Sequence, residues 1–104
     1  MLKVTILLPT TYNDGLPVWE SRIRCILNSL RELTGGYTID GSVKGTYKMD
    51  DGHFATDDSI KVWVVVDCAL FQRLREWAES VCVLLNQESL YFEYHETKVE
   101  FIRP

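Results

Sequence analysis

Three residues that alternate along one short segment, Tyr91, Glu93 and His95, have side chains that could do chemistry together. Residues two apart in a β-strand point to the same face, so a strand over Leu90–His95 would place them side by side. Glu and His at this spacing could act as an acid–base pair or hold a metal ion. The same side chains could instead form a polar network in an interface, because shielded polar groups usually satisfy one another. We favour the network.

A second cluster of potential ligands lies in the segment DDGHFATDDS, which holds Asp50, Asp51, His53, Asp57 and Asp58. Carboxylates and an imidazole this close could bind Mn²⁺, Mg²⁺ or Ca²⁺. The spacing departs from that of an EF-hand loop. Asp and Gly are also the residues that turns prefer, and this preference alone explains the composition. We therefore expect a solvated hairpin tip, no metal site and no cofactor.

A third candidate is the segment LLPTTYNDGLPVW near the start of the chain. Pro9 would end a strand, and Pro17 suits the first turn of a helix. The residues Asn-Asp-Gly between them are those that a turn selects. Three hydroxyl side chains exceed what a simple turn needs, so this end of the strand is a candidate ligand-binding site, formed by Thr10, Thr11, Tyr12 and Asn13.

The hydrophobic pattern predicts the elements that would position these groups. Apolar runs of β-branched residues indicate strands, and apolar residues at helical spacing indicate helices. Gly35-Gly36 and Asn86 suit left-handed helix ends, and Asp67 suits a helix N-cap. The expected elements are a strand over 3–8, a helix from 19 to about 34, an extended segment over 37–49, a strand over 60–66, a helix over 68–85, a strand over 90–95 and a short last strand over 99–102.

This order predicts one domain over residues 1–104 with an α+β, ferredoxin-like split β-α-β sandwich. The order is βαββαβ plus a short C-terminal strand, with an antiparallel sheet and two helices on one face. The first and third strands are the most apolar and would lie at the centre of the sheet.

The sheet face away from the helices, which we call the open face, has an apolar centre. Alternation places Leu7, Trp63, Val65 and Tyr91 there, with a polar rim from Lys44, Thr46, Lys48, Lys61, Glu93 and His95. An apolar centre with a polar rim is typical of an interface or a ligand surface. We expect a second copy of the chain on this face; the alternative is that the last strand and the loops fold over it. A ligand on this face would contact Trp63, Tyr91, Glu93 and His95.

Composition narrows the function classes. The chain has 104 residues, 46% of them hydrophobic, and a net charge of −4, which disfavours a nucleic-acid partner held by phosphate contacts. The three cysteines match no zinc or redox spacing, so we expect reduced thiols in a cytoplasmic protein. No stretch is long enough to span a membrane, and none resembles a signal peptide. No nucleophile motif is present, and the glycine-rich GGYTIDGSVKG follows a helix where a phosphate-binding loop would open one.

Four segments carry a resemblance to known proteins. LLPTTYNDG, GGYTIDGSVKGTY, DDGH with TDDS, and QESLYFE together resemble a group of small bacterial proteins of unassigned function, over nearly the whole chain. The order of elements is also similar to PII-type signalling proteins and ACT domains, which implies an oligomeric fold that binds small effectors. Acylphosphatases and small CRISPR-associated nucleases share this fold. The first loop here lacks the arginine of the former, and Leu8-Pro9 stand where the latter have an aspartate.

These observations together favour a non-catalytic, homo-oligomeric regulatory or interaction module that binds a small ligand. One alternative is a small metal-assisted hydrolase or nuclease that uses the Asp, His and Glu residues above. Another is an accessory subunit of a hetero-complex.

Overall fold

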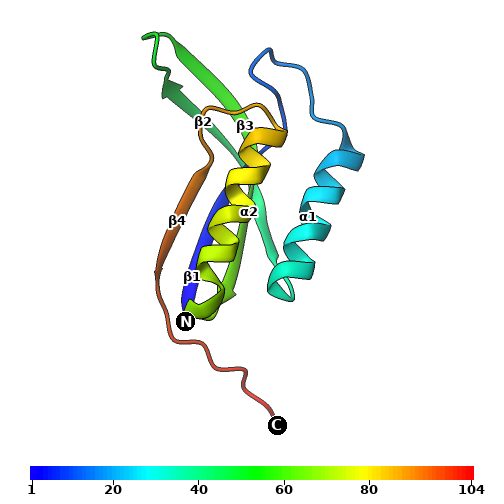
Figure 1. Cartoon of the computed structure of the whole chain (residues 1–104), viewed down its shortest axis with the longest axis vertical. Coiled ribbons are helices and arrows are strands. Elements are labelled where there is room, and N and C mark those ends of the chain that lie inside the picture. The colour runs from blue at the N-terminus through cyan, green and yellow to red at the C-terminus, as the bar shows by residue number, and fades with distance from the viewer.

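The computed structural model describes all 104 residues and has four strands and two long helices (Figure 1). The elements are β1 (Leu2–Pro9), α1 (Glu20–Thr34), β2 (Thr38–Lys48), β3 (Phe54–Val66), a 3-10 turn η1 (Cys68–Leu70), α2 (Phe71–Leu84) and β4 (Tyr91–Glu96). The strands form one antiparallel sheet in the order β2-β3-β1-β4, with β1 and β3 at its centre. The α+β ferredoxin-like fold is confirmed, with both helices on one face of the sheet (Figure 1).

The short last strand expected over residues 99–102 is not formed. Residues 97–104 have no regular structure and leave the sheet below β4 as an extended tail (Figure 1). The segment Glu96–Lys98 contains no glycine or other turn-forming residue that could reverse the chain within so few positions. The backbone N–H of Thr97 donates to the carbonyl of Met1, which extends the pairing with β1 by one residue past the end of β4, and the tail then bends away beneath the sheet (Figure 1).

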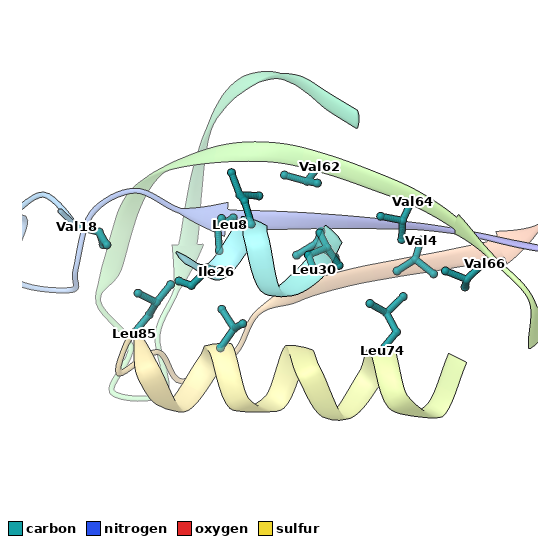
Figure 2. Packing of buried hydrophobic residues seen from close by; sticks show 13 residues of the cluster. Val4, Leu8, Val18, Ile26, Leu30, Val62, Val64, Val66, Leu74 and Leu85 are labelled. Carbon is teal, nitrogen blue, oxygen red and sulfur yellow. The ribbon is translucent and has the colours of Figure 1, made fainter. Parts of the chain in front are cut away.

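The hydrophobic core lies between the sheet and the two helices, where side chains from both layers meet (Figure 2). The core contains Val4, Ile6, Leu8, Val62, Val64 and Val66 from the sheet, with Ile26, Leu30, Leu74, Val81 and Leu85 from the helical layer. These six sheet residues alternate with Leu7, Trp63 and Val65, the residues predicted to lie on the open face, so the alternation along β1 and β3 is confirmed. Burial of this apolar surface is the main stabilising term for a domain of this size.

Helix α1 begins later than the sequence indicated. It starts at Glu20, and Pro17 lies outside it, in an isolated bridge with Thr11. The bridge folds the first loop back on itself, so Pro17 belongs to that loop and not to the first helical turn. The expected ends are confirmed: Gly35 has a φ of 86° and Asn86 a φ of 53°, both in the left-handed region. The Asp67 side chain accepts a hydrogen bond from the N–H of Ala69 and caps the 3-10 turn that leads into α2.

A β-bulge in β2 changes which side chains share the open face. Ile39 pairs with Val62 and Ser42 pairs with Ile60, so three steps along β2 match two along β3. Gly41 provides the left-handed residue of this irregularity, with a φ of 85°. The extra residue reverses the alternation beyond it. The expected placement on the open face is therefore wrong for Lys44, Thr46 and Lys48, which point to the opposite side, and their places are taken by Val43, Gly45 and Tyr47.

The hairpin of β2 and β3 extends beyond the rest of the sheet. β1 ends opposite Ser59 and Thr10 still bonds to Asp58, so residues 54–57 of β3 pair only with β2. This overhang contributes to a long molecule, 50 Å by 28 Å by 24 Å. The hairpin leans toward the start of β4 (Figure 1). None of the helices is long and apolar enough to cross a membrane.

Candidate functional site

The open face has the predicted centre. Strand pairing places Leu7 opposite Lys61 and Tyr91, and places Trp63 opposite Thr5. Leu7, Trp63 and Val65 are half-buried in the single chain, because no helix packs on this side. Thr5 lies between them and is only 5% exposed. A central apolar strip therefore runs across β1 and β3.

Charged side chains border this strip. The ammonium of Lys3 lies 4.5 Å from the centre of the Trp63 ring, a cation–π contact between the two central strands. The ammonium of Lys61 lies 3.7 Å from a carboxylate oxygen of Asp40. Both lysines therefore keep their charged ends at the border while their stems cover apolar surface.

The three residues expected to share a face on β4 do so. Tyr91, Glu93 and His95 pair with Leu7, Thr5 and Lys3 on the open face. The Tyr91 hydroxyl donates a 3.1 Å hydrogen bond to the Glu93 carboxylate, and this bond raises the pKa of Tyr91 above its usual value. Glu93 therefore has Tyr91 as its partner, and the structure contains no hydrogen bond between Glu93 and His95 that would form an acid–base pair.

A cleft opens where the overhanging hairpin leans over the end of the open face. It has a volume of about 360 Å³, within the range of small-molecule sites. We call it the tyrosine cleft; its walls are Leu7, Pro9, Tyr47, Lys48, Met49, Asp50, Asp57, Ser59, Glu88, Ser89, Leu90 and Tyr91. Two tyrosines, three carboxylates, one lysine and two serines thus line this hollow together with apolar side chains.

Ser59 forms part of the floor of the tyrosine cleft. It is only 7% exposed, and it lies on the open-face side of β3, opposite Pro9. Ser59 lines the cleft, and its hydroxyl has no hydrogen-bond partner in the chain; since no fully buried side-chain polar atom lacks a partner, this hydroxyl reaches solvent. A hydroxyl group that opens into a hollow is available to a bound molecule.

Only the first part of the acidic segment, residues 50–53, forms the turn at the hairpin tip. Asp57 and Asp58 lie in β3, which begins at Phe54 and not at residue 60 as expected. The Asp51 carboxylate accepts hydrogen bonds from the backbone N–H and the ring of His53. The backbone bond, followed by the ring contact, lowers the pKa of Asp51. No group of three or more His, Cys, Asp or Glu side chains lies close enough together to hold a metal ion. The metal-assisted alternative therefore lacks a ligand set within one chain.

The first loop uses most of its polar groups internally. The Thr10 hydroxyl donates to the carbonyl of Asp58 at 3.1 Å, and the Asn13 amide donates to the carbonyl of Asn86 at 3.2 Å. The Tyr12 hydroxyl accepts a 3.2 Å bond from Arg22. These contacts tie the loop to β3, to the end of α2 and to α1.

The candidate residues therefore separate into two groups. Tyr12 and Asn13 line a hollow beside the end of α2, whereas Trp63, Tyr91, Glu93 and His95 lie on the open face. Sequence reasoning missed three residues that the tyrosine cleft brings together with Tyr91, namely Tyr47, Ser59 and Glu88, and it named Asp57 only as a possible metal ligand. Regular alternation along β2 places the Tyr47 side chain on the helix side, so the open-face position of Tyr47 could not be predicted without the bulge. The sequence feature that could have indicated the bulge is Gly41, because an isolated glycine within a strand often marks one.

Comparisons with known proteins give a fold and no family. No protein-family model matches the chain, and no curated protein matches it. Among solved structures, a phage SAM lyase in complex with S-methyl-5'-thioadenosine is similar with a TM-score of 0.70 and 14% identity, over 91% of this chain and 80% of that one. The divalent cation tolerance protein CutA1 of Thermus thermophilus is similar with a TM-score of 0.67 and 19% identity, over 97% and 88%. CutA of Pyrococcus horikoshii is similar with a TM-score of 0.64 and 16% identity, over the same shares. At these identities the likeness shows the fold alone.

Proposed function

We propose that the chain is a homo-oligomeric binding module, with a second copy on the open face and a small organic cation in the tyrosine cleft. The observation that carries this proposal is the tyrosine cleft itself. Its two tyrosines and three carboxylates belong to segments far apart in the sequence, and the fold brings them to one hollow.

The apolar strip supports the assembly. Leu7, Trp63, Val65 and Tyr91 form a centre with a charged rim, the composition of a protein interface. Most soluble oligomers are symmetric homo-oligomers, so a second copy is the natural cover. The tail supplies only a partial cover, since Val99 and Phe101 border a hollow beside Trp63 without filling it.

Light scattering tests this assembly at micromolar concentration. Trp63→Arg places a second cation beside Lys3 and should shift the mass of the oligomer to that of the monomer. Trp19→Arg is the matched control, because Trp19 is 78% exposed on the helical side and should leave the mass unchanged. A wild-type chain that is strictly monomeric would contradict the assembly.

The chemistry of the tyrosine cleft supports a cationic ligand. Tyrosine ring faces attract cations, and the attraction grows when the site excludes water. Asp50, Asp57 and Glu88 add negative charge that only Lys48 offsets. The carboxylates lie too far apart to form a metal site, but an organic cation with its charge spread over several atoms fits such a hollow. The Ser59 hydroxyl would bind a polar group of the same molecule.

A sulfonium compound is the first ligand to test. One protein of similar fold is a SAM lyase, and the sulfonium of S-adenosylmethionine is a cation that tyrosines and carboxylates can hold. Titration calorimetry should show that S-adenosylmethionine binds about tenfold more tightly than S-adenosylhomocysteine, its uncharged thioether counterpart. Asp57→Asn should remove this preference, whereas Glu32→Gln on exposed α1 should keep it. Equal binding of the two compounds, or no binding, would contradict a sulfonium site.

Cleavage of the bound sulfonium is a second candidate function. Glu88 provides a carboxylate at the rim of the same cleft, and the Tyr47 and Tyr91 hydroxyls could hold the substrate. In this reaction a water molecule would attack the Cγ atom of the methionine part while the Glu88 carboxylate accepts its proton. The Cγ–sulfur bond would break with its electron pair going to sulfur, which gives homoserine and neutral S-methyl-5'-thioadenosine. Chromatography of S-adenosylmethionine after incubation with the protein measures this product directly. Glu88→Gln should reduce its formation, and a ligand recovered intact would leave binding as the function.

A further inference from the structure

The edge strand β4 has a row of backbone groups with no partner. β4 pairs with β1 on one side only and forms one border of the sheet. The N–H of Thr97 donates to Met1, so the backbone groups of the odd-numbered residues face β1. The groups of Phe92, Tyr94 and Glu96 therefore point outward from the sheet, because backbone groups alternate along a strand. An exposed row of this kind is a template for a further strand.

A groove runs beside this edge, between β4 and α2. It has a volume of about 350 Å³. We call it the α2–β4 groove; it is lined by Arg75, Ala78, Glu79, Cys82, Leu90, Phe92 and Tyr94. Arg75 and Glu79 form no ion pair within the chain. The groove therefore presents apolar surface and two free charges next to an unpaired strand edge.

The tail that follows β4 contains apolar side chains that are largely exposed. Phe101 is 80% exposed and Ile102 is 83% exposed, among the most exposed large apolar side chains of the protein. Lys98, Glu100 and Arg103 are interspersed with these side chains and form no ion pairs in the chain. This composition is typical of a strand at the edge of a sheet, although the tail pairs with no strand in the single chain.

We propose that the tail of one copy pairs antiparallel with β4 of a second copy, and that the second tail does the same in return. The two-fold axis would pass near Thr97, so each β4 and its tail would form one continuous strand. Reciprocal exchange of this kind closes a symmetric pair and joins the two sheets edge to edge.

The outward backbone groups fix the pairing. Even-numbered residues of β4 would meet even-numbered residues of the partner's tail, on the side of the sheet that carries the helices. Lys98 would lie opposite Glu96, an attractive pair of charges. Glu100 would lie opposite Tyr94, at the part of the α2–β4 groove that Arg75 borders. Ile102 would lie opposite Phe92 and enter the apolar part of the groove, beside Cys82.

This interface uses the edge of the sheet, whereas the assembly proposed above uses its open face. The two interfaces use different surfaces, but Trp63 borders a hollow together with Val99 and Phe101 of the tail, so the mass of Trp63→Arg alone does not distinguish them. A measurement confined to the edge strand therefore tests the edge pairing separately from the open-face assembly.

Cysteine cross-linking tests the edge pairing. Cys25→Ser and Cys68→Ser remove the two exposed thiols and leave Cys82 in the groove. Adding Ile102→Cys should give a disulfide-linked dimer on mild oxidation with diamide, seen on a non-reducing gel, with a peptide joining positions 82 and 102. Phe101→Cys is the matched control, because this neighbouring side chain would face away from the groove. Monomer only, a bond within one chain, or equal dimer from both variants would overturn the proposal.

A charge exchange tests the register in the same Ile102→Cys background. Lys98→Glu should lower the yield of cross-linked dimer several-fold, since it opposes Glu96 with a like charge. Adding Glu96→Lys should restore the yield. Circular dichroism before oxidation checks that each variant is folded. A yield that Lys98→Glu leaves unchanged, or that Glu96→Lys fails to restore, would overturn the pairing.

Discussion

The ring of Tyr47 lies directly over Gly45, two residues earlier on the same face of β2. A Cβ atom at position 45 would overlap the ring, so only glycine lets Tyr47 lie in this position. The contact connects a backbone feature of the hairpin to the wall of the tyrosine cleft, because Tyr47 is one of its two tyrosines.

Gly45→Ala should therefore weaken the binding of an organic cation. The added methyl group would displace the Tyr47 ring from its present position in the cleft wall, and the loss of one cation–π contact corresponds to about tenfold in affinity. Titration calorimetry with S-adenosylmethionine measures this effect. Gly36→Ala is the control, because a Cβ at position 36 meets no atom within 4 Å. Unchanged affinity in Gly45→Ala would show that Tyr47 does not contact the ligand.

Glu93→Gln should bring the pKa of Tyr91 down toward its ordinary value. The Glu93 carboxylate accepts the hydrogen of the tyrosine hydroxyl and opposes the formation of a second negative charge, which raises the pKa of Tyr91. The contact therefore stabilises the folded state, and this contribution is fully present below the ordinary tyrosine pKa of about 10. The contribution is lost as the pH rises from there through the raised pKa of the folded chain. Ultraviolet titration of tyrosinate, with Tyr91→Phe to assign the signal, measures the shift. Glu96→Gln, which has no contact with Tyr91, should leave the titration unchanged.

Two adjacent glycines should respond to the same substitution with opposite signs. Gly35 ends α1 in the left-handed region, where an alanine costs about 1 kcal/mol. Gly36 has no such conformation and has open space around it, so Gly36→Ala should be neutral or stabilise the protein by up to about 1 kcal/mol. Urea denaturation of the two variants gives both values. Equal destabilisation would mean that the left-handed φ of Gly35 is not what ends this helix.

The main strands could be predicted because their residues obey a single local rule. Val62, Val64 and Val66 alternate with Lys61, Trp63 and Val65, and nothing interrupts the period of two, so both faces of β3 follow from the sequence. The helix ends followed from Gly35 and Asn86 for an equally local reason, the ease with which these residues adopt a left-handed backbone.

The tyrosine cleft could not be predicted, because it depends on one irregular residue and on distant segments. Gly41 shifts the register of β2 and moves Tyr47 to the open face, and no propensity fixes where such a bulge occurs. Glu88 reaches the cleft only because the overhanging hairpin leans over the start of β4. Pro17 was misplaced for a similar reason, since its bridge to Thr11 is a contact within the loop and not a helical preference.

The hairpin tip should be sensitive to acid through a single carboxylate. The backbone N–H of His53 and then its ring hold the pKa of Asp51 below 3.8, so the ionised form is favoured in the folded chain. The contribution of Asp51 is therefore present above the unfolded pKa and is lost as the pH falls through the lower folded value. His53→Ala removes the ring contact and keeps the backbone donor, so it should reverse only part of the shift. Carbon-detected NMR titration of the Asp51 carboxyl group measures both values. If His53→Ala returned the pKa fully to the unfolded value, the backbone bond would not be its principal cause.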